Sequence, residues 1–307
     1  MDQLLSLIFT MDFVHLVIKL STPILLATIA VLISDRAGVT NIGVEGTMLF
    51  AALMGVIGSA YMNSVWLGLL IAMLSGVLFS AIISLFHLKL GTNIVLTGIA
   101  INQLASGLTI FLLFVLTGDK GVSSSLQSKT VPDIHIPIIE NIPIVGELLS
   151  GHNLLTYVAF LLVIITSVFL RKTKIGTYIR AVGENPESVE TAGISPKLIQ
   201  FKALLISGAI AGIGGAFMSM AYVSMFTKDM IAGRGFIALA AEAMGCGKPF
   251  LSMISALVFG LADAISNDLQ LVNIPSELTR IIPYIVTVIA LAIYAYRDQK
   301  KKRKKDN

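Results

Sequence analysis

Charged side chains interrupt the apolar runs of this sequence at two places that share one design. Residues 35–46 read DRAGVTNIGVEG and place Glu45 directly before a further apolar run. Residues 227–249 read TKDMIAGRGFIALAAEAMGCGKP, where Arg234 and Glu242 flank a short apolar stretch between glycines. Irregular polar backbone at membrane depth is tolerated only where protein or a water-filled cavity surrounds it. Two such segments at matching places in a chain point to a transport pathway.

Glu45 has two open interpretations. It is either a functional carboxylate within the membrane, or a structural acceptor for nearby backbone N–H groups and for Arg36. The apolar run after it, Thr47–Tyr61, is too short for a comfortable span. We therefore expect this helix to begin inside the glycine-rich part.

Uncharged amides form a second group of candidate site residues. Asn41 lies in the first irregular segment, and Asn93, Asn102 and Gln103 lie in the apolar segment 91–116. Hydrogen bonds between packed helices are one explanation, and the lining of a pathway for a neutral polar solute is the other. Amides in place of charges suit a ligand that has donors and acceptors but no net charge.

Enzyme motifs are absent from the sequence, which contains no nucleotide-binding P-loop, HExxH zinc site or serine elbow. The stretch FGLAD (259–263) only partly matches the aspartate motif of intramembrane proteases, because its second glycine is an alanine. Glu45, Glu242 and Asp263 could relay protons in an ion-coupled secondary transporter, and a channel is a third possibility. The single cysteine, Cys246, excludes an intramolecular disulfide and a cysteine-rich metal site, and we predict no metal.

The polar interval 171–202 separates two apolar runs, Leu154–Leu170 and Ala203–Val223, and its centre reads as a turn and a short capped helix. Asn185 is the expected cap and Pro186 the first helical residue, while the carboxylates of Glu187 and Glu190 suit the N-terminal dipole. Gly193 and Pro196 end the helix. Basic residues beside spans resist translocation, so this interval is expected to be cytoplasmic. It is either a connector or a helix that docks on a partner. Its basic residues are Arg171, Lys172, Lys174, Arg180, Lys197 and Lys202.

Composition predicts an all-α integral membrane protein with one domain. Of 307 residues, 55% are hydrophobic and only 13% are charged, and several apolar runs approach the roughly 20 residues that a span needs. We count nine hydrophobic segments, giving eight to ten spans, the last being Ile281–Tyr296. In the sixth, Gly208 and Gly212 have the spacing that lets two helices approach closely.

Charge distribution predicts the orientation. The tail 297–307 holds seven of the 22 basic residues, so the net charge of +4 marks one membrane face and anchoring on lipid, with no nucleic acid as partner. The loop 118–153 carries two lysines and four carboxylates and is expected outside. Counting back from a cytoplasmic tail puts the N-terminus outside, with its first span retained and no removable signal peptide.

Three stretches carry a resemblance to a known family: DRAGVTNIGVEGTML (35–49), GTYIRAVGENPESVETAGI (176–194), and AGRGFIALAAEAMG (232–245) with IPSEL (274–278). The chain resembles the inner-membrane permease subunits of ATP-binding-cassette (ABC) importers, in the group that includes branched-chain amino acid and simple-sugar permeases. The resemblance covers nearly the whole chain and is closest to the nucleoside-importing branch. One departure is EAMGCGKP, where relatives often have a bulkier apolar residue in place of Glu242.

The resemblance implies a transport subunit of the bacterial plasma membrane that is not itself an enzyme and holds no cofactor. Two homologous permeases pair, a partner ATPase binds ATP and docks on the cytoplasmic loop, and a lipoprotein delivers the solute outside. The solute would be a nucleoside, with a simple sugar or a branched-chain amino acid as alternatives. The residues implied to couple to the ATPase are Arg180, Ala181, Gly183, Glu184, Asn185, Pro186, Ala192 and Gly193.

Overall fold

Long apolar helices make up most of the protein. The computed structural model describes residues 11–135, 137, 150–271, 281–289 and 292. Within these, seven helices are long and apolar enough to cross a membrane. They are α2 (Met11–Asp35), α3 (Val44–Tyr61), α4 (Val65–Ser84), α5 (Ile94–Thr117), α8 (Leu154–Lys172), α11 (Pro196–Phe217) and α13 (Pro249–Leu271). Single π-helical turns, η1 (Leu85–Lys89) and η2 (Met218–Tyr222), continue α4 and α11.

The predicted helical membrane protein is thus confirmed in this coarse form. Seven of the nine predicted segments correspond to these helices, and the irregular segment 227–249 contains the shorter α12 (Arg234–Gly245). Most of the ninth, Ile281–Tyr296, and the whole basic tail lie outside the described residues. The number of spans therefore stays a prediction.

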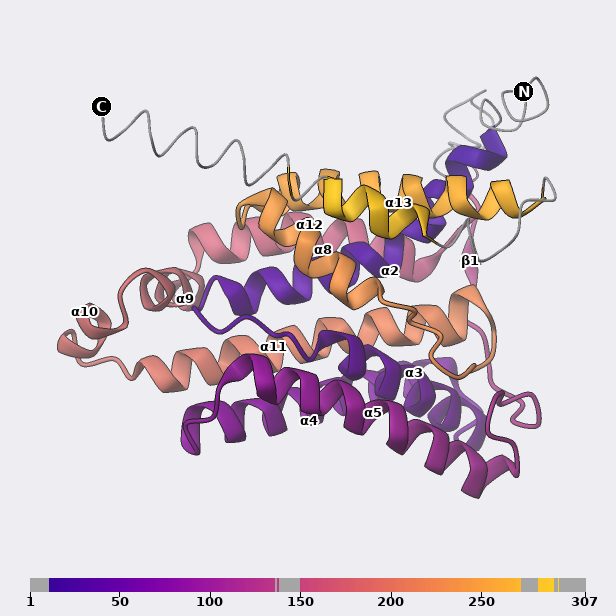
Figure 1. Cartoon of the computed structure of the whole chain (residues 1–307), viewed down its shortest axis with the longest axis horizontal. Coiled ribbons are helices and arrows are strands. Elements are labelled where there is room, and N and C mark those ends of the chain that lie inside the picture. Colours follow the sequence, from indigo (N-terminus) through magenta and orange to yellow (C-terminus); the bar gives the residue numbers. More distant parts are fainter. Residues whose placement is uncertain (1–10, 136, 138–149, 272–280, 290–291, 293–307) are drawn as a thin grey trace.

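Helix α2 forms the centre of the bundle (Figure 1), where it packs against α8, α11, α12 and α13. Every residue from Leu20 to Ser34 is buried, although Pro23 lies inside the helix. A helix that is apolar on all sides has to be surrounded by other helices. Its burial explains why α2 can scaffold both irregular segments, which lie against it.

Small residues bring α11 close to α4 and α3. A Cβ atom at Gly208 would overlap the carbonyl oxygen of Gly76 in α4, and one at Gly212 would overlap that of Ala72. On the neighbouring face, a Cβ at Gly215 would overlap the carbonyl oxygen of Met48 in α3. The glycine spacing therefore serves helix packing, as predicted.

A helix begins inside each irregular segment, as the sequence predicts. Helix α3 begins at Val44, inside the glycine-rich stretch. Helix α12 has 12 residues, about 18 Å, which is too short to cross a bilayer. The turns before it hold Asp229, Ala232 and Gly233 at positive φ.

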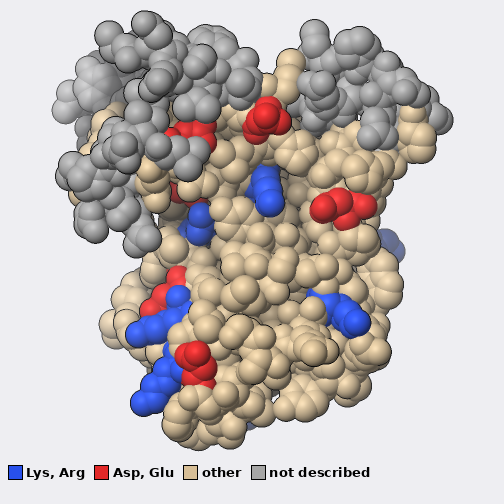
Figure 2. Space-filling view, turned by 90° about the vertical axis from the view of Figure 1, so that its right-hand side faces the viewer, with Lys and Arg blue, Asp and Glu red and all other residues tan. Residues whose placement is uncertain are grey.

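The two polar loops lie at opposite ends of the bundle (Figure 1). One end carries α9 (Lys174–Glu184) and α10 (Pro186–Thr191). The other carries the antiparallel pair β1 (Asp133–Ile134) and β2 (His152–Asn153). Figure 2 shows this second end, where the visible charged side chains are few and of both signs. The side of the membrane on which each loop lies stays a prediction.

Helix α9 is a difference from the sequence interpretation, which placed a turn at Arg180–Glu184. These residues instead end an amphipathic helix, which begins where the Thr173 hydroxyl accepts the Gly176 N–H. Ile179 and Val182, three residues apart, form its buried face. Gly176 and Gly183 lower the intrinsic helix propensity of this segment, so the sequence did not indicate a helix. The packing of its buried face stabilises the helix instead.

Candidate functional site

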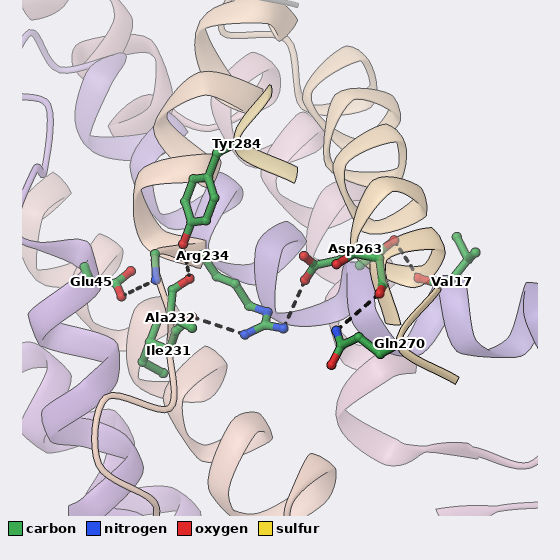
Figure 3. Close-up of polar contacts among 11 residues, drawn as sticks. Val17, Glu45, Ile231, Ala232, Arg234, Asp263, Gln270 and Tyr284 are labelled. Atoms are coloured by element: carbon green, nitrogen blue, oxygen red, sulfur yellow. Dashed lines mark hydrogen bonds and ion pairs between the residues drawn. The ribbon is translucent and has the colours of Figure 1, made fainter. Parts of the chain in front are cut away.

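Glu45 joins the two irregular segments. Its Oε1 accepts the N–H of Gly233 at 2.8 Å (Figure 3). Its Oε2 accepts the N–H of Gly235 at 2.7 Å. These N–H groups lie at the start of α12, where four backbone donors have no partner inside the helix. A Cβ at Gly235 would come within 2.7 Å of the Glu45 Cα, so this close approach requires glycine. The carboxylate therefore caps α12 from the first turn of α3.

Arg234 turns away from Glu45, toward α13. Its Nη2 lies 3.0 Å from Oδ2 of Asp263, and its Nη1 donates to the carbonyl oxygen of Ile231 at 3.3 Å (Figure 3). Both charged side chains are 15% exposed. The Nε of Arg234 is buried and has no hydrogen-bond partner among the described residues.

A polar cavity of about 540 Å³ opens beside this ion pair. Its size falls within the range of small-molecule sites, about 300–1,000 Å³. The lining includes two cationic and two anionic side chains, which balance. The polar lining residues are Tyr222, Lys228, Asp229, Arg234, Asp263, Ser266, Asn267, Gln270 and Tyr284.

The wall of the cavity is fixed from several elements. The Tyr284 hydroxyl donates to the carbonyl oxygen of Ala232 at 3.0 Å, and Ser106 of α5 donates to Asp229 at 3.1 Å. Together with the Glu45 cap, these bonds hold the turn that precedes α12. The arrangement can bind a polar solute by hydrogen bonds to these side chains.

Of the seven predicted pathway residues, the structure brings Arg234 to the cavity lining and Glu45 directly behind it. Asn102 fixes the start of α3, because its Oδ1 accepts the Gly46 N–H at 2.8 Å and its Nδ2 donates to the Ile42 carbonyl oxygen at 3.1 Å. Asn41 is fully buried and donates to Ser207 at 3.1 Å. These contacts are structural ones, and the predicted pathway roles stay predictions.

The other two amides lie away from the cavity on α5. Asn93 caps this helix, since its Oδ1 accepts the Val95 N–H at 2.8 Å, and it is exposed. Gln103 is also exposed. Neither side chain lines the polar cavity.

Glu242 lies at the other end of α12, which is not one of the seven candidate spans. It is buried, with 6% of its surface exposed, beside Asp35 and Arg36. Burial raises the pKa of Glu242 to about 7, and the charge of Asp35 adds to the increase while Arg36 opposes it. It does not line the polar cavity.

Sequence reasoning missed most of the α13 wall. Asp263, Ser266, Asn267 and Gln270 fall on one face of a helix, at spacings of three and four residues. This polar stripe in an apolar segment was the available signal, of which only Asp263 was considered. Tyr222 and Tyr284 carried no signal, because aromatic residues are common in apolar segments.

The predicted short helix of the polar interval is present. The Asn185 side chain accepts the Ser188 N–H at 3.1 Å, Pro186 is the first residue of α10, and Gly193 has φ +80° after it. The outer face of α10 is exposed, while Val189 is buried against its neighbours. Ala192 lies at the end of this helix.

The remaining coupling residues belong to α9. Gly183 packs on the loop after α2, where a Cβ would overlap the carbonyl oxygen of Arg36. Arg36 in turn donates to the carbonyl oxygens of Gly247 at 2.8 Å and Cys246 at 2.9 Å, in the turn that follows α12. Gly183 thus contacts the first irregular segment, and Arg36 links it to the second.

Comparisons with known proteins agree with the resemblance noted from the motifs. A family model described as "Branched-chain amino acid transport system / permease component" matches residues 14–291. The nucleoside ABC transporter permease protein NupC of Lactococcus lactis is 31% identical over 89% of this chain and 89% of that protein. The guanosine ABC transporter permease protein NupQ of Bacillus subtilis is 32% identical over 94% and 92%.

A third relative, the putative glucose ABC transporter permease protein TsgC13 of Haloferax volcanii, is 33% identical over 84% of this chain and 77% of that protein. No solved structure matches the chain. Family and relatives confirm the predicted permease resemblance and a multi-pass protein of the plasma membrane. The chain therefore belongs to the family of permease components of branched-chain amino acid transport systems.

Proposed function

We propose that this permease imports a nucleoside as a subunit of an ABC transporter whose partner subunit hydrolyses ATP. The observation that carries the proposal is the polar cavity at the start of α12, in a chain similar over most of its length to nucleoside and guanosine permeases. A transport subunit of this kind needs a solute site and a contact with its ATPase. The cavity and α10 are the candidates for these two sites.

The cavity chemistry favours a neutral solute. Arg234 and Asp263 neutralise one another, so a zwitterionic amino acid would have to break an ion pair before binding both charges. Asn267 and Gln270 offer amide donors and acceptors, and Tyr222 offers a ring face. A nucleoside combines an uncharged hydrogen-bonding edge with a flat ring, and this matches the lining better than an aliphatic side chain would.

The proposed partners are assigned to the two ends of the bundle. The end that carries α10 faces the cytoplasm and docks on the ATPase through the exposed face of that helix. The end that carries β1 and β2 faces outward and receives the solute from a binding lipoprotein. A second, homologous permease completes the pathway. The coupling residues predicted from the sequence keep this role in the proposal, except Arg180, whose side chain lines a separate pocket. Asn185 caps the docking helix and Pro186 begins it.

The solute assignment is tested with the complete transporter in a deletion strain or in proteoliposomes. Uptake of labelled nucleoside should depend on ATP and should be inhibited by unlabelled nucleosides, but not by glucose or leucine. If glucose alone inhibits uptake, the transported solute is a sugar and the nucleoside assignment is wrong. Proton- or sodium-driven accumulation by the isolated permease would contradict the ABC assignment and support a secondary transporter.

The cavity is tested by a matched pair of amide substitutions. Asn267→Ala removes an amide from the cavity lining, whereas Gln103→Ala removes an exposed amide elsewhere. An uncharged hydrogen bond contributes about 0.5–1.5 kcal/mol, so Asn267→Ala should weaken apparent affinity roughly 2- to 12-fold. Gln103→Ala should leave it unchanged. The opposite pattern would favour the pathway predicted from the sequence over this cavity.

A further inference from the structure

A second, smaller pocket lies at the α9 end of the bundle and shares no lining residue with the polar cavity. Its volume is about 180 Å³. Four segments form it: the start of the loop after α2, the last turns of α8, helix α9, and the turn between α12 and α13. Its charged lining residues are Arg36, Arg171, Arg180, Glu184 and Lys248. Four cationic side chains thus converge with one carboxylate.

Most of this positive charge is not neutralised within the described part of the chain. The guanidinium of Arg36 is occupied by two backbone carbonyl groups. Arg180 makes neither an ion pair nor a hydrogen bond there, and its Nε is buried. Arg171 and Lys248 are exposed and likewise form no ion pair with a described residue. Converging cations with a desolvated, unpartnered donor call for an anion.

The pocket is held open by close backbone packing. A Cβ at Gly176 in α9 would overlap the carbonyl oxygen of Phe169 in α8, which fixes these two helices against one another. A Cβ at Gly247 would overlap the Arg36 guanidinium, which fixes the turn before α13. Arg180 and Lys248 are therefore presented from closely packed elements.

The position of the pocket indicates which anion reaches it. It lies at the end of one candidate span, α8, and at the start of another, α13. Just inside these ends, both helices have exposed apolar residues, including Ile165 and Val168 on α8 and Leu251 and Ile254 on α13. Such residues suit acyl chains, and the basic groups beyond them lie at the depth of lipid headgroups.

We propose that this pocket binds a phosphate group, and that the phosphate is the headgroup of an anionic phospholipid. The forked donors of Arg180 contact the phosphate oxygens, while Arg171 and Lys248 supply further positive charge. The acyl chains lie along the exposed faces of α8 and α13. Because Arg36 and Gly183 also join this end to α12, a bound lipid stabilises the arrangement of α9 relative to the α12–α13 turn.

The test uses the full-length permease in detergent with three probes: short-chain phosphatidylglycerol, short-chain phosphatidylcholine, and inorganic phosphate. Thermal unfolding measures binding, because a ligand of the folded state at free concentration L stabilises it by RT ln(1 + L/Kd), so the melting temperature rises once the ligand concentration exceeds Kd. Phosphatidylglycerol should raise the melting temperature progressively with the logarithm of its concentration above Kd, and phosphatidylcholine should not raise it. Arg180→Gln should weaken the apparent affinity for phosphatidylglycerol at least tenfold, and Arg180→Lys should retain part of it.

Lys172→Gln is the matched control, since Lys172 is an exposed neighbour of Arg171 that does not line the pocket. Lys248→Gln is a second variant at an exposed position, in case Arg180→Gln fails to fold. Equal protection by inorganic phosphate and phosphatidylglycerol would retain the phosphate site and make free phosphate the ligand. If Lys172→Gln and Arg180→Gln weaken the apparent affinity for phosphatidylglycerol equally, the lipid binds through diffuse positive charge and the proposed pocket is wrong.

A final arm repeats the titration with the partner ATPase bound. Phosphatidylglycerol should still bind with an affinity within about threefold. If the ATPase abolishes lipid binding to the wild type, and Arg180→Gln weakens ATPase assembly instead, the pocket receives an acidic side chain of the ATPase and the lipid proposal fails.

Discussion

Glu45 Oε1 lies 2.8 Å from the backbone nitrogen of Gly233, so a carboxylate at the start of α3 caps the start of α12. This one side chain connects the two glycine-rich segments and fixes the turn that carries Arg234 into the polar cavity. Of the two interpretations that the sequence leaves open for Glu45, the contacts support the structural acceptor. Its acceptor bonds go to Gly233 and Gly235, and none of its contacts is with Arg36.

Glu45→Gln should destabilise the protein and reduce uptake. A glutamine presents one carbonyl oxygen where the carboxylate presents two acceptors, so one N–H of α12 faces an amide donor. Hydrogen bonds to charged groups contribute about 1.5–3 kcal/mol, and the free energy of unfolding should fall by this amount. Thermal unfolding and uptake measure the two effects. Glu190→Gln, at an exposed position of α10, is the control for stability alone and should leave the melting temperature unchanged. Unchanged melting of Glu45→Gln would contradict the capping role.

Arg234 and Asp263 should show strong coupling in a double-mutant cycle. Arg234→Leu leaves the Asp263 carboxylate without its partner, and Asp263→Leu leaves the guanidinium without one. Breaking a buried pair costs about 3–5 kcal/mol, whereas replacing both partners costs far less. The double variant should therefore be more stable than either single variant. Its uptake should stay low, because both residues line the cavity. Additive losses of stability would show that the pair is not formed.

Gly183→Ala should lower stability, because the added Cβ overlaps the Arg36 carbonyl oxygen and forces the backbone to shift. Overpacking of this kind costs about 1–3 kcal/mol. Gly107→Ala is the matched control: it lies within α5, and a Cβ there meets no atom within 4 Å. It should be neutral or stabilising by up to about 1 kcal/mol. Equal melting temperatures of the two variants would contradict the packing at Gly183.

Consequently, a transport defect at Gly183 does not by itself identify an ATPase contact. The exposed face of α10 provides a cleaner test. Glu190→Lys reverses a charge at an exposed position and leaves the Asn185 cap in place. It should reduce ATPase stimulation and uptake, while the melting temperature of the isolated permease stays the same. Lys129→Glu reverses an exposed charge in the loop at the other end and should not affect ATPase stimulation. Normal stimulation in Glu190→Lys would remove this face of α10 from the proposed contact.

The sequence by itself determined the class of protein, most of its helices and the features that depend on near neighbours. Composition and run length are enough for apolar spans, because a lipid environment admits few alternatives. The α10 cap was predictable because Asn185 bonds to a residue only three positions away. The glycine spacing of α11 indicated close packing, because glycines repeated on one helix face leave room for a neighbouring backbone, and this can be read directly from the sequence.

Only the tertiary structure decided which distant groups meet. Glu45 and Gly233 are 188 positions apart, and nothing in the local pattern selects this partner over Arg36. The same holds for Gly183, which the sequence marks only as an implied coupling residue, because its close approach to the Arg36 carbonyl group appears only in the structure. The polar stripe of α13 became a cavity wall only once Arg234 lay opposite it. A residue's type sets which bonds it can make, but the packing of the whole bundle around α2 selects the partners it reaches.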